Sequence, residues 1–249
     1  MSEHKFPTEV IDLPSGGKVY PKDSPLAEGK LELKYMTAKE EDILMSENLI
    51  KKGVVIDKLL DSLIVTKGVT SDDLLVGDKN AVLVAARILA YGPEYTVEVT
   101  NPNNIEQKVE HTFDLTNCPF KESVKDVDYS DNCFEFETPV GKNKIKFKLI
   151  TGKEEKIIEK ELEQSSKYGY NTSISTRLRH TIIEVDGDDK PETITAFSQN
   201  MLARDSMALR NYIQEISPDI DLTSEIEIGG ESVSVSIPLT VEFLWPKSI

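Results

Sequence analysis

The sequence predicts an α+β protein: helical N-terminal and C-terminal segments, a small antiparallel β-sheet inserted between them, and a C-terminal β-hairpin. Residues 37–91 contain capped, apolar-periodic stretches that are typical of helices. Residues 93–150 alternate apolar and polar side chains with a period of two, which is typical of strands. Helical patterning returns at residue 153 before a second alternating region. We therefore expect four segments: an irregular arm (1–29), a helical unit (30–92), a small antiparallel β-domain (93–150) and a helical segment ending in a β-hairpin (151–249).

The first segment is rich in proline and glycine. Residues 7–29 contain Pro and Gly at a spacing that forbids a long helix, so we expect an extended arm or a wrapped loop. Residues 30–35 alternate apolar and polar side chains, which predicts a short strand. Thr37 and Glu40 then have the spacing of a capping box, in which each side chain accepts from the other residue's backbone N–H, and this predicts the start of a helix.

Three further helices are expected in the helical unit. Gly53 ends the first helix or separates it from a second over residues 54–63. Residues 71–73, Ser-Asp-Asp, can cap a short helix, and Asp78 can cap a longer one that runs through Tyr91.

The alternating segments predict the sheet and the hairpin. Four candidate strands belong to the small sheet, whose charged alternate positions leave one face in solvent: 95–100, 111–115, 133–137 and 144–150. Helical or mixed stretches are expected at 153–162 and 174–184, another helical stretch follows the acidic loop at 186–191, and Asp205-Ser206 opens a helix over 207–216. Alternation then resumes around Gly229-Gly230 and continues in a strand over 239–246. This strand–turn–strand layout is similar to that of residues 95–115. A degenerate internal repeat and two unrelated hairpins both remain open as explanations.

Charge excludes several classes of protein. The 249 residues contain 44 Asp and Glu against 29 Lys and Arg, for a net charge of −15. A general nucleic-acid binder and a protein held on an anionic membrane by basic residues both need the opposite sign. The first 92 residues carry 15 acidic and 12 basic side chains, so they are nearly neutral and are the better place to seek a partner.

No targeting segment is visible in the sequence. The N-terminus lacks a basic start followed by an apolar run, and the longest apolar stretch, residues 81–90, is shorter than the roughly 20 residues that a bilayer requires. We therefore expect a cytoplasmic protein with reduced thiols and no membrane partner.

Catalytic and cofactor motifs are absent from the sequence, so we expect no enzyme activity and no cofactor. His111, Cys118 and Cys133 could supply three zinc ligands, but no fourth ligand is identifiable, so ordinary thiols are favoured and no metal is expected. The acidic residues within 186–189 place their glycine too early for a calcium loop, which favours a solvated loop. The basic cluster at 177–180 favours a salt-bridged helix face or a partner contact over nucleic acid.

Several blocks resemble the baseplate proteins of T-even bacteriophages. The most specific block begins Leu-Pro-Ser-Gly-Gly-Lys-Val-Tyr at residues 13–20 and continues through residues 24–44. Weaker matches follow along nearly the whole chain, at 49–53, 77–80, 85–88, 203–206, 209–213 and 243–246. Related tail proteins often carry a Cys-Pro-x-Cys zinc knuckle after a strand like 95–100. Here residues 101–104 are Asn-Pro-Asn-Asn, so zinc is not carried over.

The resemblance implies a phage protein made in the bacterial cytoplasm that helps to assemble the tail baseplate hub by chaperone-like, non-covalent association. The implied partners are hub or tape-measure proteins, and self-association is also open. The alternative is a permanent structural subunit of the baseplate. As partner-binding residues we predict Tyr20, Pro25, Tyr35 and Met36, which are apolar or aromatic and lie in or beside irregular segments. The competing interpretation is that these four side chains pack against the protein's own helices.

Overall fold

The computed structural model describes residues 6–121, 127–167, 169, 171–239 and 241–245. Its content of helices and antiparallel strands confirms the predicted α+β class. The described α-helices are α1 (Ala38–Leu44), α2 (Glu47–Lys51), α3 (Val55–Leu63), α4 (Val76–Tyr91), α5 (Gly152–Lys167), α6 (Ser173–Thr181), α7 (Pro191–Asn200) and α8 (Ala203–Ile216). The described strands are β1 (Thr8–Asp12), β2 (Lys30–Lys34), β3 (Glu94–Asn101), β4 (Asn104–Asp114), β5 (Phe134–Glu137), β6 (Lys144–Phe147), β7 (Ile182–Val185), β8 (Thr223–Ile228) and β9 (Glu231–Ser236).

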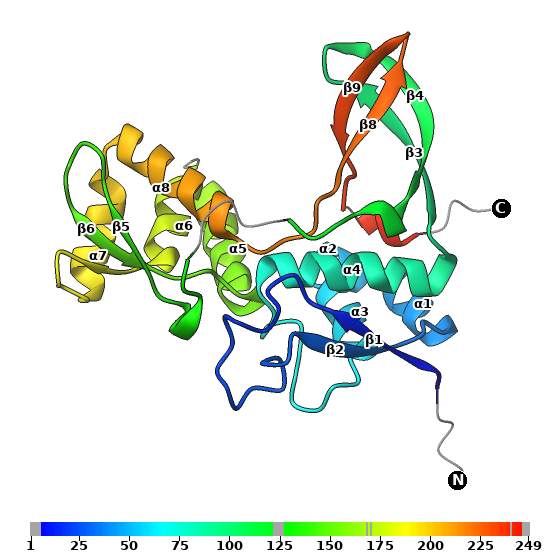
Figure 1. Cartoon of the computed structure of the whole chain (residues 1–249), viewed down its shortest axis with the longest axis horizontal. Coiled ribbons are helices and arrows are strands. Elements are labelled where there is room, and N and C mark those ends of the chain that lie inside the picture. The colour runs from blue at the N-terminus through cyan, green and yellow to red at the C-terminus, as the bar shows by residue number, and fades with distance from the viewer. Residues whose placement is uncertain (1–5, 122–126, 168, 170, 240, 246–249) are drawn as a thin grey trace.

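These elements pack around two hydrophobic clusters, which define two lobes (Figure 1). The first lobe comprises the described residues 6–121, 219–239 and 241–245. Its buried side chains come mainly from β2, α1, α3, α4 and the hairpins β3–β4 and β8–β9. The second lobe comprises the described residues 127–167, 169 and 171–217, and it buries side chains of β5–β7 and α6–α8 in a cluster that Val19 and Leu75 of the first lobe also join. Its sequence lies between the two parts of the first lobe, so the chain leaves the first lobe after β4 and returns to it before β8.

The N-terminal segment is more regular than predicted. Within the predicted irregular arm, Thr8–Asp12 form β1, which pairs antiparallel with β2. Residues 13–29 then form a wrapped loop whose Leu13, Val19 and Leu26 side chains are buried. The wrap needs glycine at position 17, where φ is +77° and a Cβ atom would lie 2.3 Å from the carbonyl oxygen of Ala27. Residues 1–5 of the predicted arm lie outside the described residues.

Local signals predicted most of the helical unit. The capping box before α1 is confirmed, with both reciprocal contacts between Thr37 and Glu40 present. Helix α4 runs to Tyr91 as predicted but begins at Val76, ahead of the predicted cap. The short helix that residues 71–73 were predicted to cap is wrong, because these residues form a turn and the next helix is α4.

Side-chain carboxylates hold that turn in place of a helix. The carboxylate of Asp61 accepts from the backbone N–H and the hydroxyl of Ser71 at 2.9 and 2.8 Å. The carboxylate of Asp73 accepts from the backbone N–H of Thr70 at 2.8 Å. Two backbone donors of the turn are thus satisfied without helical bonding.

The strands predicted as one small sheet belong to two. Strand β3 pairs with β4 in a hairpin, whereas β5 and β6 form a three-stranded sheet with β7 in the order β5-β6-β7. Strand β7 comes from a region predicted only as helical or mixed. The sheet joins Ile145 to Val185 in register, a long-range pairing that alternation alone does not specify.

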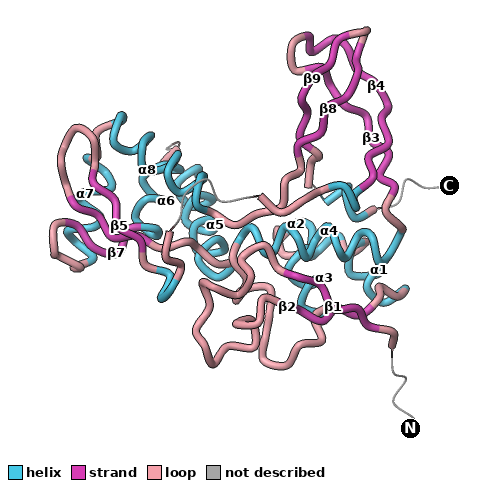
Figure 2. Tube along the Cα trace, viewed as in Figure 1, coloured by secondary structure: helices cyan, strands magenta, loops and turns pink. Residues whose placement is uncertain are grey.

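The hairpins β3–β4 and β8–β9 stand together on the first lobe and form what we call the twin-hairpin arm, residues 94–114 and 223–236 (Figures 1 and 2). Their apolar faces pack against each other, with Val97 and Val99 on one side and Ile226, Val233 and Val235 on the other. The arm therefore brings together the two sequence regions whose layouts are similar, although a hairpin pair of this kind does not distinguish a repeat from two unrelated hairpins.

The two connections at the base of the arm also pair with each other. Phe120 and Ile220 form an antiparallel bridge. The backbone N–H of Lys121 donates to Asp219 at 2.8 Å, and that of Asp221 donates to Pro119 at 2.7 Å. These linkers tie the second lobe to the foot of the arm.

The C-terminal strand predicted over 239–246 is wrong. The segment Val241–Leu244 forms a 3-10 helix, and Phe243 and Leu244 are fully buried in the first lobe. The ring of Phe243 packs edge-on against Tyr95 of β3, with centroids 4.9 Å apart. Thr240 and Pro246 of the predicted strand lie outside the described residues.

Across the residues that the structure describes, no helix combines the length and the apolar character needed to cross a membrane.

Candidate partner-binding site

The wrapped loop at residues 13–29 is anchored to α4 by a buried carboxylate. Asp78 is fully buried and accepts from the backbone N–H of Ser15 at 2.9 Å and from the hydroxyl of Tyr20 at 2.5 Å. The same Tyr20 hydroxyl accepts from the backbone N–H of Leu75 at 2.9 Å. The polar end of Tyr20 is thus occupied inside the protein, in agreement with the competing interpretation for this residue.

Burial sets the protonation behaviour of this pair. It raises the pKa of Asp78 because the carboxylate loses solvation, and the hydrogen bonds from Tyr20 and Ser15 offset only part of that effect. Burial also raises the pKa of Tyr20, and the neighbouring charge of Asp78 raises it further. The phenol therefore stays protonated and donates.

Beside this anchor lies a cleft of about 710 Å³ where the two lobes meet. Residues 18–26 of the wrapped loop form one wall, and the turn at 68–75 and the segment 130–132 of the second lobe face it. Tyr20 and the exposed Pro25 both line the cleft. Two of the four predicted partner-binding residues therefore share one concave surface.

The other two predicted residues lie elsewhere. Tyr35 and Met36 follow β2, are half-buried and do not line the cleft. Met36 packs against the first hydrophobic cluster, and its sulfur lies 3.7 Å from the hydroxyl of Tyr91 on α4. The role of all four residues in partner binding stays a prediction.

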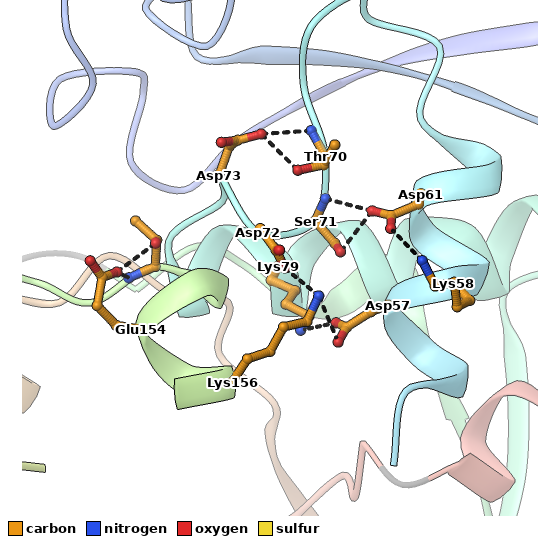
Figure 3. A network of polar contacts seen from close by, with 11 residues as sticks. Asp57, Lys58, Asp61, Thr70, Ser71, Asp72, Asp73, Lys79, Glu154 and Lys156 are labelled. Carbon is orange, nitrogen blue, oxygen red and sulfur yellow. Dashed lines mark hydrogen bonds and ion pairs between the residues drawn. The ribbon is translucent and has the colours of Figure 1, made fainter. Parts of the chain in front are cut away.

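The second lobe is fastened to the first beside this cleft by a network of charges (Figure 3). Asp57 on α3 bridges Lys79 of α4, at 2.5 Å, and Lys156 of α5, at 3.1 Å. Lys156 also pairs with Asp72 in the turn. Burial alone would lower the pKa of Lys156, but the two carboxylates outweigh it and raise that pKa. The network joins α5 to α3, to α4 and to the turn that forms part of the cleft, and Lys153 at the start of α5 also lines the cleft.

The sequence predicted neither the buried Asp78 anchor nor the charge network around Asp57 and Lys156. The sequence predicted Asp78 only as a helix cap, and neither Asp57 nor Lys156 was singled out. The contacts join residues 22 to 99 positions apart, and no spacing in the sequence reports such contacts.

The residues considered for zinc or calcium binding do not form a metal site in the described part of the chain. The ring of His111 packs edge-on against Phe113 at 4.7 Å, Cys118 is half-buried and Cys133 is exposed. Within the described ranges, no group of three His, Cys, Asp or Glu residues is placed to hold a metal ion. Asp186 accepts from the backbone N–H of Lys144 on β6, and Asp188 accepts from the backbone N–H of Lys190 in its own loop.

The basic cluster at 177–180 forms a salt-bridged helix face. Arg177 contacts both carboxylate oxygens of Glu155, at 2.6 and 3.0 Å, and Arg179 pairs with Glu161. This confirms one of the two expectations for the cluster.

The fold and the site define a two-lobed α+β protein with a projecting arm and an interlobe cleft. The family model for the T4 bacteriophage base plate protein matches residues 5–134, more than half of the chain. The chain belongs to this family. The match spans the wrapped loop, the helical unit and the first hairpin of the arm. No curated protein and no solved structure matches the chain.

Proposed function

We propose that the protein is a phage-encoded assembly factor for the tail baseplate hub, which acts in the host bacterial cytoplasm by holding a hub or tape-measure protein through non-covalent contacts. The observation that supports this proposal is membership of the baseplate family, whose matched region contains the wrapped loop and the cleft wall that it forms. The proposed activity is association, with no covalent chemistry.

The cleft is the proposed docking surface. It is concave, open, mixed in charge and lined by an exposed proline on a loop that the Asp78 anchor keeps rigid. A rigid, preformed surface loses little conformational entropy when a partner binds.

Affinity purification of the tagged full-length protein from infected cells tests the proposal. We expect a hub or tape-measure protein to copurify, and failure to recover any baseplate component would contradict the assembly role. Quantitative mass spectrometry of purified particles then separates a transient factor, absent from the particle, from a permanent subunit present in stoichiometric amounts.

Point variants are better probes of the site than a deletion of residues 1–29. That deletion would remove β1 and the buried Leu13, Val19 and Leu26, and so would unfold the first lobe. Lys22→Glu combined with Pro25→Glu changes exposed residues of the cleft wall, and we expect it to reduce copurification. Ala38→Glu combined with Lys39→Glu makes the same change in charge at exposed positions outside the cleft and should not.

A further inference from the structure

A second cavity, distinct from the cleft, lies at the foot of the arm. It has a volume of about 300 Å³ and is enclosed by the N-terminal end of α4, by α6 and α8, and by the linker at 217–219. Its floor is apolar and includes Leu149, Leu178 and Ile213. Its lining contains four cationic side chains against one carboxylate, in a protein whose net charge is −15: Lys121, Lys148, Arg177 and Arg210 against Asp219.

Arg210 differs from the other three cations. Lys148 pairs with Glu154, Arg177 with Glu155, and Lys121 with Asp219. Arg210 is exposed, its Nε donates to the backbone carbonyl of Ser206 at 3.3 Å, and no carboxylate of the described residues forms an ion pair with it. Its remaining N–H groups are free to meet a carboxylate from outside.

The arm carries the complementary chemistry at its tip. Ile105, just after the β3–β4 turn, is 78% exposed, the highest exposure of any large hydrophobic side chain in the described part of the chain. Glu106 follows it, and the arm as a whole has eight acidic residues against one lysine. The tip lies at the end of the arm that points away from the helices (Figure 1), so it does not face the cavity of its own chain.

We propose that the arm tip of one copy docks in the cavity of a second copy, with Ile105 on the apolar floor and Glu106 against Arg210. We assign the arm tip of a second copy to the cavity because the chemistry of the tip is complementary to that of the cavity lining. An exposed apolar side chain next to a carboxylate meets an apolar cavity whose Arg210 guanidinium has no carboxylate partner among the described residues, and one chain supplies both surfaces. Each copy then offers one tip and one cavity, so the contact is head-to-tail and generates a ring or an open chain of subunits. This inference is independent of the proposed hub function, which concerns the cleft.

Sedimentation velocity of the full-length protein over a wide concentration series tests the contact. We expect self-association that strengthens with concentration and weakens with salt, because the rim contacts are charged. Arg210→Glu should weaken it roughly tenfold or more, as loss of an interfacial charge pair does. Arg204→Glu, which changes the same charge at an exposed position on the same helix outside the cavity, should leave it unchanged.

A charge exchange and a crosslink identify the two surfaces. Glu106→Lys alone should weaken association, and Glu106→Lys together with Arg210→Glu should restore it. A photo-reactive residue at position 105 should crosslink to the cavity lining of another copy. A chain that stays monomeric at every concentration, an equal effect of Arg204→Glu, a double variant without recovery, or crosslinks elsewhere would each overturn the proposal. Circular dichroism confirms that each variant is folded before it is compared.

Discussion

The first turns of α1 and α4 each hold a fully buried carboxylate at the third helical position, Glu40 and Asp78. Both sit at the positive end of a helix dipole, yet their pKa values move in opposite directions. Burial raises the pKa of each carboxyl. At Glu40, hydrogen bonds from Lys34, Thr37 and Ser62 outweigh burial and lower the pKa to about 2. At Asp78 no cation of the described residues donates a hydrogen bond, and the pKa rises.

The difference shows what a cationic partner does to a buried acid. The ammonium of Lys34 lies 2.8 Å from Glu40, so ionised Glu40 stabilises the folded state. Asp78 serves as an acceptor for two neutral donors, and its ionised form costs solvation. Its contribution is therefore fully present below the pKa of the unfolded chain and declines as the pH rises through its folded pKa.

The largest expected effect is the removal of the acceptor at α4. Asp78→Ala should lower the free energy of unfolding by roughly 3–5 kcal/mol, because the buried donors of Ser15 and Tyr20 would each lose a partner at about 1–3 kcal/mol. Urea denaturation measures this loss. Asp23→Ala, at an exposed position of the same loop, serves as the control, and a similar loss in both variants would show that Asp78 is not the anchor.

Glu40→Gln should cost roughly 3 kcal/mol at neutral pH, since the pKa is lowered by more than two units and each unit corresponds to about 1.4 kcal/mol. The stabilisation by Glu40 is present above the unfolded pKa of about 4.3 and is lost as the pH falls toward 2. Urea denaturation across this range should therefore show the variant and the parent converging at low pH. A constant gap between the two curves would contradict the assignment, and Glu28→Gln, exposed and distant, should match the parent throughout.

Tyr20→Phe should cost about 1–2 kcal/mol, because it removes one donor from Asp78 and the acceptor of the Leu75 N–H. It should also raise the pKa of Asp78 further, because the Tyr20 hydrogen bond lowers it. Carboxyl-carbon NMR titration reports that pKa directly. Tyr35→Phe, at a half-buried position outside the cleft, should change neither quantity, and an unmoved Asp78 titration in Tyr20→Phe would exclude the contact.

The smallest expected effect is at the charge network between the lobes, which resembles the Glu40 site in pairing acid with cation but is more exposed. Lys156→Ala should cost about 1 kcal/mol or less, because water screens a partly exposed pair. Thermal unfolding of Lys156→Ala measures this loss of stability, and Lys160→Ala, at an exposed position of the same helix, serves as the control. A loss as large as that of Asp78→Ala would mean that the network, and not the buried anchor, holds the cleft together.

Local chemistry predicted much of the fold. The Thr37 and Glu40 capping box lies within four residues, and the alternating segments at 95–100 and 226–237 form strands as expected. The pairing of strands was not predictable, because β7 joins β6 through contacts about forty residues apart in sequence. Strand β1 was hidden by neighbouring prolines and glycines that serve the loop after it.

The candidate site was predicted only in part. Tyr20 and Pro25 were placed correctly on an irregular loop, but the sequence does not show that Tyr20 turns its hydroxyl inward while Pro25 stays exposed. That distinction depends on Asp78, 58 positions away. Tyr35 and Met36 have the same apolar character but lie outside the cleft.

The two hairpins of the arm are translated at different times, because the second lobe lies between them in the sequence. The hairpin β3–β4 is complete once Asp114 has been translated, whereas β8–β9 and Phe243, which cover its apolar face, come after the whole second lobe. At a translation rate of roughly 5–20 residues per second, the apolar face of β3–β4 stays uncovered for several seconds before β8–β9 and Phe243 are made. A chain that stops early keeps the face exposed, and exposed apolar surface of this kind attracts chaperones and proteases. Closure of the arm therefore marks a chain that has been translated at least as far as Phe243.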